Sequence, residues 1–176
     1  MAARLDAYRS LMQELDGKAT LVAVSKTKPV EDILELYQAG HRDFGENYVQ
    51  ELVAKQPLLP QDIRWHFIGH LQSNKVKYIA PFVHLIHGVD SFKLLKEINR
   101  QAEKNNRIIQ CLLQVHIAQE ETKFGLDESE LEQVLTSPEL PLLKNVHISG
   151  LMGMASFSDD MQLVRSELHY LKSLID

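Results

Sequence analysis

The chain has 176 residues, of which 44% are hydrophobic, and a formal net charge of −5. This length suffices for one domain with a sizeable core, and the acidic balance, with basic residues spread along the chain, argues against a nucleic-acid binder. No apolar run approaches membrane-spanning length, and the amino-terminal residues lack the apolar core of a signal peptide. The single cysteine, Cys111, excludes an internal disulfide and favours a cytoplasmic location.

Helix and strand patterns alternate along the chain. Residues 2–15 carry the apolar stripe of an amphipathic helix. Six segments have the pattern of strands, the longest being the fifth: 20–26, 42–47, 65–69, 83–89, 108–117 and 146–154. Helical patterns follow them: from 29, 48–55, 74–80, 91–106, from 127 and from 158.

Helix starts carry recognisable capping residues. Ser73, Ser91 and a residue near Ser158 are expected to cap the helices that follow them. Asp127, with Glu130 three residues further on, has the pattern of a capping box. These signals support the positions of the later strand–helix units.

Regular alternation of strands and helices predicts an α/β protein with a parallel sheet and helices outside it. Two sheet arrangements are compatible with this pattern: an open doubly wound sheet or part of a (β/α)8 barrel. Neither a Gly-x-Gly-x-x-Gly motif nor a P-loop is present, so the usual nucleotide-binding motifs are absent. A complete barrel needs at least about 200 residues, and we therefore expect this chain to be an incomplete one.

Lys26 follows the first predicted strand, where α/β folds place their chemistry. Alternation puts Lys26 on the same side as Val22 and Val24, so its stem is expected in apolar surroundings. A desolvated lysine binds its proton less tightly, and a neutral amine can attack an aldehyde to form an imine. The alternative is a lysine that extends to solvent from the strand end.

The eight histidines raise the question of a metal site. His66 and His70 are four residues apart, but the segment between them has the pattern of a strand end, not of a zinc-binding helix. His84 and His87 are expected on opposite faces of their strand. The spacing therefore predicts no metal site. Cys111 lies within an apolar segment and is expected to be a small buried residue.

Four segments carry a family resemblance: Ala23–Pro29, Phe44–Glu51, Trp65–Lys75 and Ser149–Met154. In this order and spacing they resemble the pyridoxal phosphate homeostasis proteins, which are built like the N-terminal barrel of alanine racemase. The resemblance runs from the first helix to the last residue. It implies a fold of the (β/α)8 TIM-barrel type, alanine racemase N-terminal-like, with about six of the eight strand–helix units in this chain.

The resemblance also implies a cofactor site. Lys26 would form the Schiff base with pyridoxal 5′-phosphate, while Asn47, His70 and Met152 would line the mouth of the site. Each of these three has another interpretation. Asn47 could cap the helix that begins at Tyr48, His70 could be a satisfied histidine at a strand exit, and Met152 could belong to the core.

Two features depart from the family pattern. Family members usually have asparagine where this chain has His116, which leaves the role of that position open. The family also continues with two further strand–helix units, whose loops hold the cofactor phosphate, so we expect residues 1–176 to be a single cofactor-binding domain that is incomplete at its carboxyl end. Such a chain is expected to be a monomer if complete, and to associate through open sheet edges if truncated.

Three functions are compatible with these observations. The resemblance favours a carrier that binds pyridoxal phosphate without established turnover and buffers it or delivers it to pyridoxal phosphate-dependent apo-enzymes, without a nucleic-acid or membrane partner. An amino-acid racemase would need a second acid–base group on the opposite face of the substrate, and none of the five tyrosines has the context of that group in alanine racemase. The third alternative is a scaffold without a cofactor.

Overall fold

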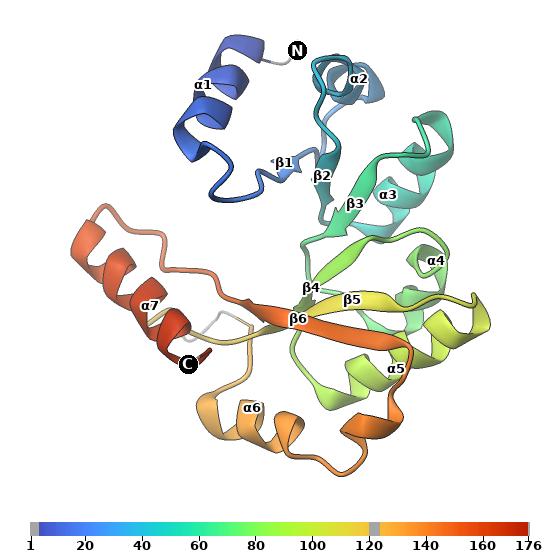
Figure 1. The fold of residues 1–176 in the computed structure, drawn as a ribbon, viewed down its shortest axis with the longest axis vertical. Helices are drawn as coiled ribbons and strands as arrows, with labels where there is room; N and C mark the ends of the chain where they lie inside the picture. Colours follow the sequence, from blue (N-terminus) through green and yellow to red (C-terminus); the bar gives the residue numbers. More distant parts are fainter. Residues whose placement is uncertain (1–3, 120–123, 176) are drawn as a thin grey trace.

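The computed structural model describes residues 4–119 and 124–175. Within them, six parallel strands form one sheet in the order in which they follow in the sequence (Figure 1). The strands are β1 (Ala23–Val24), β2 (Asp43–Glu46), β3 (Arg64–Phe67), β4 (Leu85–Val89), β5 (Ile109–Gln114) and β6 (Val146–Met152). Sequential parallel order is what repeated strand–helix units produce when each crossover has the same hand.

Seven α-helices and three short 3₁₀ helices are present in the described residues. The α-helices are α1 (Leu5–Leu15), α2 (Val30–Gln38), α3 (Val49–Lys55), α4 (Val76–Ile79), α5 (Phe92–Lys104), α6 (Glu128–Leu135) and α7 (Met161–Ser173). The 3₁₀ helices are η1 (Gln56–Leu58), η2 (Ser73–Lys75) and η3 (Leu140–Leu142). In Figure 1, α2 to α5 follow one another along one side of the sheet, whereas α1 and α7 lie on the other side near the two edge strands.

Alternation along the strands gives the sheet two different faces. Apolar strand residues pack with apolar residues of α3 to α6 into one core, which includes Phe44, Trp65, Phe67, Ile86, Cys111, Leu113, Leu52, Val76, Leu95 and Leu131. The residues between them in sequence, such as His66 and Gln110, belong to the opposite face. Because only one face is fully covered by helices, the other face and the strand ends are free to carry polar groups.

The edge helix α7 is attached by apolar contacts of Leu171 with the core and by one buried carboxylate. Glu167 is the only buried residue of α7, and its oxygens accept hydrogen bonds from the backbone N–H of Gln119 and from both the N–H and the hydroxyl of Ser156. The bonds from Ser156 hold the pKa of Glu167 below its usual range. This contact ties α7 to the loops that follow β5 and β6.

Several expected boundaries need correction. The first strand was expected over 20–26 but contains only two residues, Ala23 and Val24. The longest strand is β6, with seven residues, and not β5, which has six. Among the described strands β1 pairs with β2 alone, through Ala23 and Val24.

The capping predictions are confirmed at Ser91, at Asp127 and near Ser158, and wrong at Ser73. The hydroxyl of Ser91 accepts from the N–H of Leu94, and Asp127 forms the expected capping box with α6. Ser73 instead begins the 3₁₀ helix η2, and α7 is capped by Asp160, two residues after Ser158. In the described part of the chain, no helix is both long and apolar enough to cross a membrane.

Candidate functional site

Four candidate site residues lie at or just beyond the carboxyl ends of strands. Lys26 follows β1, Asn47 follows β2, His70 lies three residues after β3, and Met152 is the last residue of β6. In a parallel sheet these ends share one edge, the edge at which α/β proteins bind their ligands. The described fold therefore brings all four to the same end of the sheet.

Lys26 lies in an exposed turn between β1 and α2. The N–H of Ser25 donates to the carbonyl of Gly45 at 2.9 Å, which extends the pairing of β1 with β2 and sets the turn beside the end of β2. Lys26 itself is exposed, and Val24 is 54% exposed. The expectation that the lysine stem starts in apolar surroundings is therefore wrong, because this short edge strand is covered on one side only.

A buried ion-pair network, which no sequence pattern predicts as a whole, adjoins this turn. The Lys55 ammonium of α3 donates to Glu46 Oε2 at 2.9 Å and to Glu51 Oε2 at 2.5 Å. Glu46 is fully buried at the end of β2, and burial raises the pKa of its carboxyl group. The spacing of Glu51 and Lys55, four residues apart on a helix, was a usable signal, but their contact with Glu46 is tertiary.

Asn47 has a buried side-chain oxygen without a partner. Its Oδ1 accepts no hydrogen bond from any described residue. Helix α3 is capped by the backbone of Tyr48 without a side-chain hydrogen bond, so the alternative role of Asn47 as a helix cap is wrong. A buried carbonyl oxygen that lacks a donor costs free energy, about 1–3 kcal/mol, and such atoms in native structures call for an explanation.

Gly69 lies against the backbone of Asn47. A Cβ atom at Gly69 would be 2.9 Å from the Asn47 Cα and closer still to the Asn47 carbonyl oxygen. Only a residue without a side chain fits at this distance, so the loops after β2 and β3 pack closely together. The close packing holds the Asn47 side chain at the strand end.

His70 shares a hollow with Asn47. Its ring stacks on that of Phe124, with centroids 4.3 Å apart, and its Nδ1 lies 3.8 Å from Asp90 Oδ2. A hollow of about 370 Å³ is lined by Asn47 and His70 together with Lys75 and other residues of the loops after β2 and β3. The structure therefore brings Asn47 and His70 together, while Lys26 does not line this hollow.

Met152 lies on the opposite edge strand from Lys26. It is half-buried and pairs with Gln114 of β5, whereas its neighbour Leu151 packs against the apolar core. Alternation turns Met152 to the face away from that core, so the interpretation as a core residue is not supported. The sheet order separates β6 from β1 by four strands, so Met152 and Lys26 can only meet across the uncovered face.

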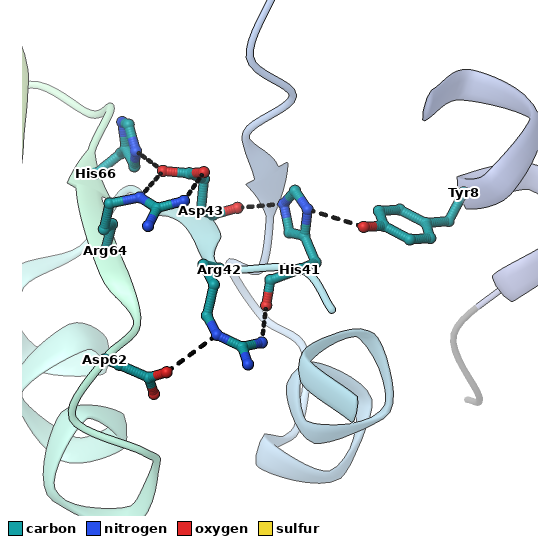
Figure 2. A network of polar contacts seen from close by, with 7 residues as sticks. All are labelled: Tyr8, His41, Arg42, Asp43, Asp62, Arg64 and His66. Carbon is teal, nitrogen blue, oxygen red and sulfur yellow. Dashed lines mark hydrogen bonds and ion pairs between the residues drawn. The ribbon is translucent and has the colours of Figure 1, made fainter. Parts of the chain in front are cut away.

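The other end of the sheet carries a separate polar network (Figure 2). Arg64 donates to both carboxylate oxygens of Asp43, at 2.9 and 2.8 Å, and His66 Nε2 contacts the same group at 2.9 Å. His41 bridges the Asp43 carbonyl and the hydroxyl of Tyr8, which ties α1 to the start of β2. Because these residues lie at the start of β2 and β3, they stabilise the fold at the end away from Lys26.

Three histidines meet on this side of the sheet. His66 Nδ1 lies 2.9 Å from His87 Nε2, and the ring centroids of His84 and His87 lie 5.4 and 5.1 Å from that of His66. The expectation that His84 and His87 face opposite sides is therefore wrong, because His84 precedes β4, which begins at Leu85, and does not follow the alternation of that strand. Among the described residues, no group of three or more His, Cys, Asp or Glu side chains is arranged to hold a metal ion.

Two further residues singled out in the sequence are Cys111 and His116. Cys111 is buried, and burial raises the pKa of its thiol to about 12, which confirms its interpretation as a small core residue. The backbone N–H of His116 donates to Leu126 beside the loop 119–125, of which residues 120–123 lie outside the described part of the chain.

The open parallel sheet with helices along one side defines a barrel-type α/β protein. A family model, the alanine racemase N-terminal domain, matches residues 2–176. A solved alanine racemase from Bartonella henselae has a TM-score of 0.74 and 19% identity, covering 95% of this chain and 49% of that one. At that identity the likeness concerns the fold, and it confirms an alanine racemase N-terminal-like barrel that is not closed here.

Proteins named pyridoxal phosphate homeostasis protein are more similar. Those of Synechocystis sp. and Aquifex aeolicus are 40% and 41% identical, over 96% and 90% of this chain and 79% and 69% of their own length. The structure of PipY from Synechococcus elongatus with pyridoxal phosphate bound has a TM-score of 0.87 and 35% identity, over 97% of this chain and 79% of that one. The chain belongs to the pyridoxal phosphate homeostasis protein family. This confirms the resemblance that was based on the order and spacing of four sequence segments.

Proposed function

We propose that the chain binds pyridoxal 5′-phosphate, holds it as a Schiff base on Lys26, and takes part in pyridoxal phosphate homeostasis. The observation that carries the proposal is an exposed primary amine, Lys26, in a turn beside the strand end where Asn47 keeps a buried oxygen without a partner. The names of the relatives and the cofactor in the PipY structure support the identity of the ligand.

The chemistry is simple in outline. The cofactor supplies an aldehyde, and the Lys26 amine condenses with it to form a carbon–nitrogen double bond with release of one water molecule. Exposure of Lys26 leaves the amine accessible to a ligand that arrives from solvent. Asn47, His70 and Met152 are proposed to orient the bound group at the carboxyl ends of their strands.

The residues at the site fit such a ligand. The buried Oδ1 of Asn47 needs a hydrogen-bond donor that the described protein groups do not supply, and pyridoxal phosphate carries both a phenolic O–H and a protonatable ring nitrogen. The exposed imidazole of His70 lies over the hollow that it shares with Asn47. A bound ligand would supply the hydrogen-bond donor that Asn47 Oδ1 lacks in the cofactor-free protein.

We further propose that the chain acts as a carrier without turnover of its own, located in the cytoplasm, with pyridoxal phosphate-dependent apo-enzymes as recipients. The homeostasis names of relatives at about 40% identity support this, whereas the alanine racemases share only the fold. A carrier should exchange the α-hydrogen of alanine with deuterated solvent far more slowly than about ten turnovers per second, a typical enzyme rate. Exchange at that rate would favour a racemase instead.

The binding proposal is tested by titrating the protein with pyridoxal phosphate and following visible absorbance. Wild type and Lys28→Ala should both develop the absorbance of a protonated Schiff base, because Lys28 is an exposed neighbour in the same turn region. Lys26→Ala should not develop it, and should keep its helical circular dichroism. Equal absorbance in Lys26→Ala would overturn the assignment.

A further inference from the structure

Two backbone groups flanking Lys26 are held by charged side chains of α3. The Lys55 ammonium donates to the carbonyl oxygen of Ser25 at 2.7 Å, and the N–H of Thr27 donates to Glu51 Oε2 at 2.6 Å. The residues immediately before and after Lys26 are thus anchored to one helix, while the Lys26 side chain itself is exposed.

The anchoring network uses every hydrogen-bond donor of the Lys55 ammonium. Its three N–H groups reach Ser25, Glu46 and Glu51, and the hydroxyl of Ser25 donates to the same Glu46 oxygen. Lys55 is 7% exposed and Glu46 is fully buried. A buried ion pair adds little net stability compared with apolar residues of the same size, so its presence beside this turn suggests a role other than stabilising the core.

The turn needs an external support. Thr27 has a φ of 62°, in the left-handed region that a β-branched residue rarely adopts. Such a conformation persists only where surrounding contacts impose it. The bond from the Thr27 N–H to Glu51 is a contact of this kind, and Glu51 is in turn fixed by Lys55.

We infer that Glu46, Glu51 and Lys55 are positioning residues that fix the turn Ser25–Thr27 and thereby present the Lys26 amine in one direction at the strand end. The inference rests on the proposed Schiff base at Lys26. It assigns the network a function at the site: a fixed turn lets the amine meet the aldehyde without first paying the entropy of ordering the backbone.

The test compares Glu51→Leu with Glu51→Gln. Glu51 is partly exposed, with 22% of its side chain accessible, so both variants should fold. Glu51→Leu removes the acceptor of the Thr27 N–H, whereas Glu51→Gln keeps a carbonyl oxygen there. In the cofactor-free protein, amide exchange at Thr27 should be at least tenfold faster in Glu51→Leu than in wild type, and pyridoxal phosphate should bind at least tenfold more weakly; Glu51→Gln should recover most of both.

Glu132→Leu is the matched control, since Glu132 is an exposed helical glutamate of α6, remote in sequence from the turn. It should change neither Thr27 exchange nor binding. One outcome would overturn the inference and leave the proposed function intact. Wild-type protein would form its pyridoxal phosphate adduct on Lys26, but Glu51→Leu would match wild type in amide exchange at Thr27 or in affinity for pyridoxal phosphate. Wild type that forms no adduct on Lys26 would overturn the proposed function and the binding part of the inference together, and Thr27 exchange would still decide whether Glu51 anchors the turn.

Discussion

Gly69 and Asn47 are in direct backbone contact, so close that a Cβ atom on Gly69 would lie 2.9 Å from the Asn47 Cα. The first prediction is that Gly69→Ala destabilises the protein by about 1–3 kcal/mol, the usual cost of forcing an extra methyl group into a packed site. It should also weaken pyridoxal phosphate binding, because the backbone that must move carries Asn47. Chemical denaturation and cofactor titration measure the two effects.

Gly150→Ala is the control for this substitution. A Cβ atom at Gly150 would meet only Leu112 Cδ2, at an ordinary contact distance of 3.7 Å. The free energy of unfolding of this variant should lie within about 0.5 kcal/mol of the wild-type value. If Gly69→Ala and Gly150→Ala behave alike, the contact between Gly69 and Asn47 does not constrain the site.

Asn47 should show opposite effects on stability and binding. Asn47→Ala removes a buried oxygen that lacks a partner, so the melting temperature of the cofactor-free protein should stay equal or rise. Cofactor affinity should fall about tenfold, the equivalent of one hydrogen bond of about 1.4 kcal/mol. Gln133→Ala, at an exposed amide of α6, should change neither quantity. A cofactor-free protein that is destabilised while its affinity is unchanged would contradict a ligand-directed role for Asn47.

His87 should make stability depend on pH. Burial, together with the neighbouring His66 and His84, lowers the pKa of His87 to about 4. The folded state therefore binds fewer protons than the unfolded state between pH 6.5 and 4, and the free energy of unfolding should fall as the pH falls through this range, by up to about 3 kcal/mol. His87→Leu should flatten this part of the profile, as measured by urea denaturation at successive pH values.

The loss of stability below pH 4, which depends on Asp43, can be compared with the loss between pH 6.5 and 4, which depends on His87. Burial alone would raise the pKa of Asp43, but hydrogen bonds from Arg64 and His66 outweigh it and bring this pKa to about 2. Asp43 therefore contributes stability above pH 4 that is lost as the pH falls toward 2, and this loss should remain in His87→Leu. His147→Leu, at an exposed histidine, should leave the slope between pH 6.5 and 4 as in wild type. An unchanged slope in His87→Leu would show that His87 is not held neutral by its surroundings.

Local signals in the sequence predicted most of the fold. The capping box at Asp127 and the cap at Ser91 depend only on residues within four positions of one another, and both are present. The strand patterns placed the end of the second strand within one residue, at Glu46 just before Asn47, whereas the first predicted strand ran two residues beyond Val24 to Lys26. The cap expected near Ser158 is Asp160, two residues further on, whereas Ser73 fails as a cap because the chain there forms the 3₁₀ helix η2.

The contacts that define the site were not predictable in this way. Lys55 reaches Ser25 across 30 positions of sequence, and no periodic pattern records that α3 packs against the turn after β1. The histidine cluster depends on where β4 begins, since His84 lies just before Leu85 and does not follow the alternation that places His87 beside His66. Exposure of Lys26 likewise follows from the edge position of β1, a property of the whole sheet rather than of its own segment.

Lys26 is proposed as the amine that binds the cofactor aldehyde. Borohydride reduction of the pyridoxal phosphate-loaded protein converts the Schiff base to a stable secondary amine, and peptide mass mapping then locates it. We expect the label on Lys26, and none on Lys28 or on Lys75, which lines the hollow beside Asn47. A label on Lys75 or Lys28 in place of Lys26 would contradict this proposal.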